Sequence, residues 1–113
     1  MTAVRKKRIR TLKREQFSKI YNKGLFVSNK HLVIYVTENL KNINFYGISI
    51  SKKIGNSVVR TRIRRLIKES IRLSQHEIKK GHNIIVVSRT KEDANFGFID
   101  KSLKKLFRKA NLI

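Results

Sequence analysis

Apolar residues recur along the chain at two spacings, one typical of helices and one typical of strands. Between residues 11 and 23 the apolar positions at helical spacing are Phe17, Ile20 and Tyr21. Thr11 is placed to cap the start of this segment, and Gly24 follows where a left-handed C-terminal cap is favoured. The pattern predicts a first helix over residues 11–23.

Two segments rich in β-branched and aromatic residues follow. They are HLVIYVT, residues 31–37, and FYGISIS, residues 45–51, with a polar connection between them. Alternation of side chains puts Val33 and Tyr35 on one face of the first segment, opposite three aliphatic residues. The pattern predicts two paired strands. Residues 25–29, LFVSN, either begin the first strand or form a short strand of their own, and periodicity leaves both open.

The longest helical pattern begins after Asn56, a good N-cap, and extends over residues 57–75. IIVVS, residues 84–88, is a short uninterrupted apolar run, typical of a central strand covered on both faces. Helical spacing returns over residues 99–110 and predicts a closing helix. The order helix, strands, helix, strand, helix predicts one α+β domain over residues 1–113, with helices packed on a small sheet.

Composition constrains what this domain binds. The chain has 28 Lys and Arg residues against 7 Asp and Glu residues, a formal net charge of +21 and a pI near 11.1. This charge opposes compaction through self-repulsion unless a polyanion neutralises it, so nucleic acid is the expected partner. Residues 1–10 carry five cations and little apolar content, which predicts a mobile basic arm.

Several other classes of protein are not indicated. No apolar run approaches the roughly 18 residues of a membrane-spanning helix, so no membrane partner is expected. The basic N-terminus is not followed by an apolar stretch of about 7–15 residues, so export is not expected. The chain has no cysteine, which excludes disulfides and thiolate ligands and fits a reducing compartment. We expect a cytoplasmic protein.

Charge is sorted on the predicted 57–75 helix. Apolar residues gather on one face, and the opposite face carries Arg60, Thr61, Arg64, Arg65, Lys68 and Arg72. A solvated helix face normally mixes signs, because like charges at i and i+4 destabilise a helix by a few tenths of a kcal/mol per pair. The unbroken cationic i,i+4 row from Arg60 to Arg72 therefore favours a polyanion-binding surface over an ordinary solvated face. Arginine also suits bidentate contact with phosphate.

The turn that enters this helix is basic as well. It contains Lys52, Lys53, Gly55 and Asn56, and backbone N–H groups at a helix start favour a phosphate. Neither G-x-x-x-x-G-K-[ST] nor G-x-G-x-x-G is present, so no nucleotide cofactor is indicated.

Aromatic residues on the first helix and first strand have two interpretations. Phe17, Tyr21 and Tyr35, with Val33, fit either an inward-packed core or a platform for unpaired bases. Because the two faces of the strand differ, one can be core while the other is a binding surface.

The acidic and histidine residues of the sequence give little support for a catalytic site in the protein. The seven acids are Glu15, Glu38, Glu69, Glu77, Glu92, Asp93 and Asp100, with only one adjacent pair. His31, His76 and His82 fall on different predicted elements and form no metal-binding spacing. The sequence predicts no catalytic residue and no metal site in this chain.

Residues 52–69, KKIGNSVVRTRIRRLIKE, closely resemble the signature of the bacterial ribonuclease P protein component. In that family a Lys-Lys-x-Gly-Asn turn precedes an Arg-Asn-Arg core and further basic residues. The matching positions are Lys52, Lys53, Gly55, Asn56, Arg60, Arg62, Arg64 and Arg65. A second landmark, F-x-x-[VI]-x-x-x-G, is met by Phe17, Ile20 and Gly24, and the resemblance covers essentially the whole chain. Thr61 departs from the usual Asn and lacks the paired donor and acceptor of an amide.

The resemblance implies a fold like that of a ribosomal small-subunit protein domain, with a left-handed βαβ crossover carrying the basic helix. It also implies two binding surfaces. The residues expected to bind the catalytic RNA are Lys52, Lys53, Asn56, Arg60, Thr61, Arg62, Arg64, Arg65, Lys68 and Arg72. Those expected to bind the 5′ leader of precursor tRNA are Phe17, Tyr21, Val33 and Tyr35.

The resemblance further implies that the RNA subunit, with bound Mg²⁺, cleaves the phosphodiester bond, so Mg²⁺ is expected on the RNA. The expected partners are this catalytic RNA and precursor tRNA, and no DNA is expected. Two alternatives differ in function. A ribosomal or other structural RNA-binding protein would share the basic helix but would not need an exposed aromatic cleft, and a metal-dependent nuclease would act alone.

Overall fold

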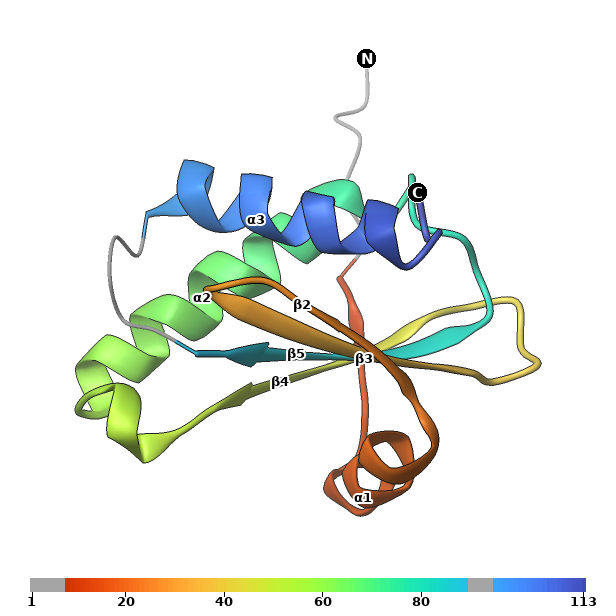
Figure 1. The fold of residues 1–113 in the computed structure, drawn as a ribbon, viewed down its shortest axis with the longest axis horizontal. Coiled ribbons are helices and arrows are strands. Elements are labelled where there is room, and N and C mark those ends of the chain that lie inside the picture. The colour runs from red at the N-terminus through yellow and green to blue at the C-terminus, as the bar shows by residue number, and fades with distance from the viewer. Residues whose placement is uncertain (1–7, 90–94) are drawn as a thin grey trace.

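The computed structural model describes residues 8–89 and 95–113. Over these residues a five-stranded sheet lies between two helical layers (Figure 1). The helix α1 (Arg14–Lys23) covers one face, and α2 (Ser57–Ser74) and α3 (Phe96–Lys109) cover the other. None of these helices is long and apolar enough to cross a membrane. The predicted α+β class is confirmed.

The strand order of the sheet is β1-β4-β5-β3-β2. The strands are β1 (Arg10–Thr11), β2 (Leu25–Ser28), β3 (Leu32–Glu38), β4 (Phe45–Ile50) and β5 (His82–Ser88). β5 pairs in parallel with β4 and antiparallel with β3, so the apolar run that predicted a central strand does lie at the centre. Because α2 connects the parallel neighbours β4 and β5, the crossover places the basic helix beside β4.

The first helix differs from its prediction at both ends. It begins at Arg14 with Lys13 as N-cap, because Thr11 belongs to β1 and pairs with Tyr46 of β4 instead. Gly24 has φ −75° and ψ 145°, so it is extended rather than left-handed. A Cβ at this position would lie 2.5 Å from the carbonyl oxygen of Ile20. Glycine is therefore required by the close approach of the backbone to the helix end.

The described part of the chain begins at residue 8. Ile9 is buried in the core and Arg10 pairs with Phe45 of β4, so residues 9 and 10 of the predicted basic arm, residues 1–10, belong to the folded domain. The first seven residues of the arm lie outside the described part of the chain. Residues 25–28 form a strand of their own, β2, which decides between the two alternatives left open by the sequence.

The α2 helix begins as predicted. The side-chain oxygen of Asn56 accepts a hydrogen bond from the backbone N–H of Val59 at 3.0 Å, which satisfies one of the donors left unpaired at a helix start. A short 3-10 turn, η1 (Lys52–Ile54), precedes this cap. The turn fixes the direction in which the basic helix leaves β4.

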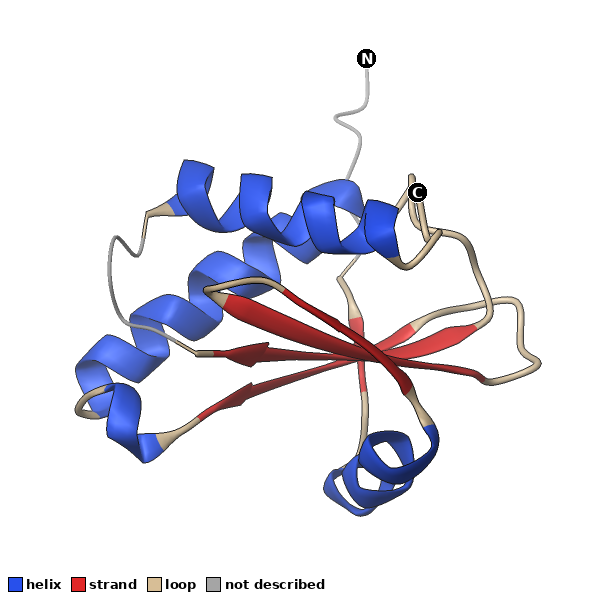
Figure 2. Ribbon diagram, viewed as in Figure 1, coloured by secondary structure: helices blue, strands red, loops and turns tan. Residues whose placement is uncertain are grey.

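Two helices cover one face of the sheet and one helix covers the other (Figure 2), and the two faces contribute unequally to the core. Under α2 and α3 lies the main cluster, in which Ile34, Ile67 and Phe107 are fully buried. Under α1 the cluster contains Leu12, Ile20 and Ile85, surrounded by partly buried side chains. One short helix covers only part of a face, so the rest of that face remains accessible.

Candidate nucleic-acid interface

Four aromatic rings form a continuous row on the α1 side of the sheet. Phe17 and Tyr21 on α1 have ring centroids 6.2 Å apart, and Tyr21 meets Tyr35 of β3 edge-on at 4.8 Å. Phe26 of β2 continues the row, 5.9 Å from Tyr35. Val33 is half-buried on the same strand as Tyr35 and faces the same side, as period two predicted. We call Phe17, Tyr21, Tyr35 and Phe26 the aromatic row.

The rings of this row differ in exposure. Phe17 packs onto the sheet, since a Cβ at Gly47 would lie 2.5 Å from its Cζ atom. Tyr21 is exposed on α1, and Tyr35 is half-buried between Tyr21 and Phe26. Phe17 therefore anchors α1 to β4, while the other rings present accessible surface. The two interpretations of the aromatic residues apply to different members of one row.

Phe26 was not among the predicted site residues. The sequence left the conformation of residues 25–29 open, and without a strand its face could not be assigned. The antiparallel register now pairs Phe26 directly with Tyr35, which puts both rings on one face. The available signal was an aromatic residue in a short apolar segment immediately after the first helix.

The cations of α2 lie on two flanks. Arg60, Arg64 and Lys68, spaced at i,i+4, form the flank that we call the β4 flank. The Nη1 atom of Arg64 donates to the carbonyl of Ile48 at 2.9 Å, and the Nε atom of Arg60 donates to the carbonyl of Gly55 at 3.1 Å. These bonds hold two guanidinium groups in fixed places while their remaining donors are available to phosphate.

The β4 flank reaches the aromatic side because β4 has an uncovered edge. β1 pairs only with Phe45 and Tyr46, so β4 has no outer partner strand at Ile48 among the described residues. Arg64 extends to this edge and lines a hollow of about 440 Å³ together with Arg14 and Phe17. Arg64 belongs to a helix on the opposite face of the sheet, and its side chain thus lines the same hollow as Phe17, the first ring of the aromatic row.

The other α2 residues predicted to bind RNA do not share this flank. Thr61, Arg62 and Arg65 line a separate shallow hollow of about 490 Å³, and we call these three residues the outer flank. Arg72 is half-buried and its Nε atom donates to Oε2 of Glu69 at 3.0 Å. This hydrogen bond raises the pKa of the guanidinium and commits it to an acid on its own helix. The single cationic face predicted from the sequence is therefore divided into two flanks, and at its C-terminal end the charge of Arg72 is offset by Glu69.

The predicted basic turn lies at the N-terminal end of α2. Lys52 and Lys53 are exposed on η1, and the backbone N–H of Lys53 donates to the Ser51 hydroxyl at 3.2 Å. Asn56 uses its carbonyl oxygen as the helix cap, so its NH₂ group remains as a donor. The turn can therefore present two ammonium groups and one amide donor to a phosphate.

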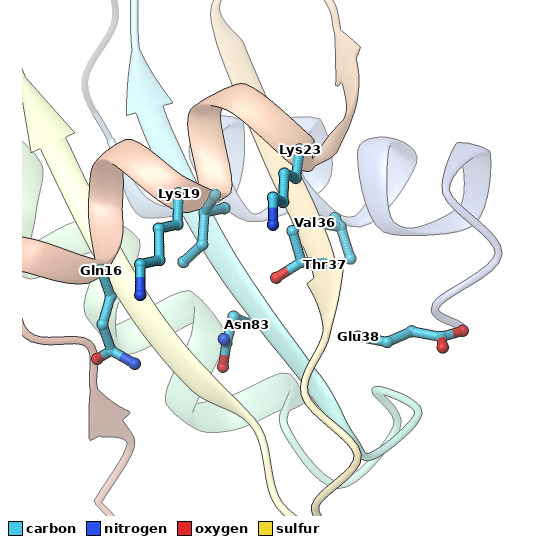
Figure 3. A pocket seen from close by; sticks show the side chains of 8 residues that line it. Gln16, Lys19, Lys23, Val36, Thr37, Glu38 and Asn83 are labelled. Atoms are coloured by element: carbon cyan, nitrogen blue, oxygen red, sulfur yellow. The ribbon is translucent and has the colours of Figure 1, made fainter.

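A third hollow, of about 560 Å³, lies beside α1 and over the ends of β3 and β5 (Figure 3). Lys19 and Lys23 extend from α1 toward the strands, where Thr37 and Asn83 lie. Most of its lining residues are polar or charged and include Glu38 as well as the two lysines, in contrast to the row that contains Tyr21. The α1 helix therefore presents different chemistry to the two parts of this face.

Within residues 8–89 and 95–113, no three histidine, aspartate or glutamate side chains come together in a group that could hold a metal ion. Asp100 is engaged between helices, accepting from the Ser70 hydroxyl at 2.7 Å and pairing with Lys104 at 3.2 Å.

Comparison with known proteins agrees with this geometry. The family model for Ribonuclease P matches residues 5–111. The chain belongs to the ribonuclease P protein family. The ribonuclease P protein component of Clostridium acetobutylicum is 47% identical over 107 residues, covering 92% of this chain and 90% of that protein.

Solved structures of the ribonuclease P family share the fold. The RNase P protein of Staphylococcus aureus superposes with a TM-score of 0.83 at 34% identity, covering 94% of this chain and 98% of that one. The protein from Thermotoga maritima superposes with a TM-score of 0.82 at 26% identity, covering 90% and 97%. The predicted family is confirmed, and with it RNA binding in tRNA processing as the class of function.

Proposed function

We propose that this protein is the subunit of ribonuclease P that binds the catalytic RNA through the cations of α2 and its entry turn. We further propose that it binds the single-stranded 5′ leader of precursor tRNA along the aromatic row. The observation that carries the proposal is the contact of Arg64 with Ile48. It brings a phosphate-binding side chain from α2 to the edge of the surface where bases can stack.

The cationic flanks support docking on RNA phosphates. Two RNA molecules must approach each other in this reaction, and both are polyanions. A surface of fixed guanidinium groups reduces their repulsion and releases condensed counterions, which tightens binding in a salt-dependent way. Residues 57–68 hold five Lys and Arg residues and no acid, so this part of α2 has no internal charge partner.

The aromatic row supports binding of an unpaired strand. Stacking on accessible rings requires bases that are free of a duplex, and the leader of a precursor supplies them. Mature tRNA has lost this strand and makes no such contact. The row therefore gives the precursor an additional binding energy that the product lacks.

The proposal places Mg²⁺ and the cleavage chemistry on the RNA subunit. A net charge of +21 disfavours binding of a divalent cation to the protein and favours binding of phosphate. The protein contributes by positioning two RNA molecules and not by proton transfer. The absence of cysteine fits the reducing cytoplasm as the compartment in which precursor tRNA would be processed.

The deciding experiment compares cleavage of precursor tRNA in Mg²⁺ by three preparations: the protein alone, the cognate catalytic RNA alone, and both together. We expect cleavage by the RNA, stimulation when the protein is added, and none by the protein alone. Cleavage by the protein alone would indicate a nuclease, and unchanged cleavage by the RNA would indicate a structural RNA-binding protein. Either result would overturn the proposal.

A further inference from the structure

Phe26 is an exposed ring on the edge strand of the sheet. Its side chain is 62% exposed and that of its neighbour Leu25 is 63% exposed. Among the residues that the structure describes, β2 pairs with β3 alone, so its outer edge is uncovered. A single exposed apolar side chain is common, but Phe26 adjoins the ring of Tyr35 and therefore extends an accessible apolar surface, which is typical of a contact site.

The geometry of Phe26 differs from that of the other ring contacts. The plane of its ring is tilted by 35° relative to that of Tyr35. The interplanar angle is 84° between Tyr21 and Tyr35, and 77° between Phe17 and Tyr21. The ring of Phe26 therefore lies closer to parallel with its neighbour and continues the direction in which bases can stack. Its side chain is mostly exposed to solvent, so an inward-packed core role does not explain it.

Charge around β2 favours an RNA strand over another protein surface. Lys23 precedes the strand by two residues, and Lys30 lies in the turn that follows it. At the same turn the Nη1 atom of Arg89 donates to the carbonyl of Asn29 at 3.1 Å. Residues 22–35 include no acid. Phosphates on either side of a stacked base would meet cations at both ends of the strand.

We propose that Phe26 is a further leader-binding residue, on which a base of the 5′ leader stacks beyond Tyr35 at the outer edge of the sheet. This inference rests on the proposed function, because it extends the same aromatic row by one platform. According to this inference, the contribution of the edge strand to binding depends on the length of the leader. A leader must be long enough to pass Tyr35 before Phe26 adds to its affinity.

The test uses the holoenzyme assembled from this protein and its cognate catalytic RNA. Affinity is measured for mature tRNA and for precursors whose leaders increase one nucleotide at a time, with wild-type protein and with Phe26→Ala. We expect Phe26→Ala to bind mature tRNA and precursors with short leaders as tightly as wild type does. Once the leader is long enough to reach the edge strand, the variant should bind about 5-fold or more weakly. The leader length at which affinity stops increasing should become shorter in the variant.

Leu25→Ala is the matched control, because it removes a similarly exposed apolar side chain from the adjacent position on the opposite face of β2. We expect it to retain the wild-type length profile. Phe26→Trp should also retain the profile, and Phe26→Leu should reproduce the loss while keeping an apolar strand residue. Circular dichroism of each free variant checks the fold. If Phe26→Ala proves to be unfolded, the length profile of Phe26→Leu decides the test in its place.

Tyr35→Ala separates failure of this inference from failure of the proposed function. If Tyr35→Ala loses leader affinity while Phe26→Ala and Phe26→Leu both match wild type at every length, the inference is overturned and the leader site stands. If Tyr35→Ala also has no effect, the leader site itself is overturned. A loss equal for mature tRNA, or equal in Leu25→Ala, would overturn the inference. Self-association of the free protein that Phe26→Leu abolishes, with leader affinity unchanged, would assign the edge to a second copy instead.

Discussion

The two faces of the sheet are built from the same strands but differ in how they are covered. Two helices of 18 and 14 residues pack on one face, and one helix of 10 residues packs on the other. Ile34 and Tyr35 are adjacent on β3, yet Ile34 is fully buried and Tyr35 is partly accessible. The difference shows how a small domain obtains both a core and a base-binding surface from a single sheet.

The same comparison separates stability from binding. The α2 and α3 face supplies most of the buried apolar area, so substitutions there should mainly affect folding. The α1 face and the exposed flanks of α2 should mainly affect RNA. Substitutions in the two regions can therefore be told apart by the free energy of unfolding and by the RNA affinity.

The largest expected effect is on the covered face. Phe107 is fully buried between α3 and the sheet, so Phe107→Ala should lower the free energy of unfolding by about 3–5 kcal/mol through lost burial and a cavity. Urea denaturation followed by circular dichroism measures this change. Tyr35→Ala on the other face should cost clearly less. Equal losses would show that both faces carry the core and would break the comparison.

The next effect concerns RNA affinity and not folding. Replacing Arg60, Arg64 and Lys68 together with alanine should flatten the dependence of log affinity on log salt by about 2–3 units, since each lost phosphate contact contributes roughly 0.7–0.9. The free energy of unfolding should change by about 1 kcal/mol or less, because these side chains lie at the surface. Filter binding to the catalytic RNA over a salt series measures the slope.

The α3 helix offers a matched control for this triple variant. Lys101, Lys105 and Arg108 are exposed on its outer surface, and their replacement with alanine removes the same charge. We expect a much smaller change in slope, because the proposal assigns RNA contact to α2. Equal slopes for the two triple variants would show that only total charge matters and would remove the β4 flank from the proposed interface.

A smaller and more selective effect is expected at Tyr35. Tyr35→Ala should weaken binding of precursor tRNA to the holoenzyme by about 1–3 kcal/mol, the usual contribution of one stacked base, while mature tRNA is bound as before. Tyr35→Phe keeps the ring and should stay near wild type. An equal loss for precursor and mature tRNA would mean that Tyr35 supports the fold and not the leader site.

Local pattern predicted the elements whose environment is simple. The α2 helix, its Asn56 cap and the central strand β5 were correctly located, because each is long or strongly periodic. The α1 start was misplaced, since the competing partner of Thr11 is a strand more than thirty residues away in sequence. Gly24 was assigned the wrong conformation for a similar reason. The backbone close to it belongs to Ile20 and Val36, which the sequence does not place together.

The candidate site shows the same limit. Sequence spacing placed Val33 and Tyr35 on one face and the arginines on one helix, and both placements hold. It could not show that Arg64 crosses to the β4 edge, because the bond to Ile48 depends on the short length of β1. The hydrogen bond between Arg72 and Glu69 could have been expected from their i,i+3 spacing. From the sequence, Arg72 was instead assigned to RNA binding, because it continues the i,i+4 row of cations.

The smallest expected effect tests this last point. Arg72 and Arg65 both belong to α2, but Arg72 is hydrogen-bonded to Glu69 while Arg65 lies in the hollow of the outer flank. Arg65→Ala should reduce the salt slope of RNA binding by up to about one unit, and Arg72→Ala by clearly less, because Glu69 already offsets its charge. Filter binding of the two variants under the same salt series gives the comparison. If Arg72→Ala changed the slope as much as Arg65→Ala, its guanidinium would have to leave Glu69 for a phosphate, and the cationic surface would extend along the whole of α2.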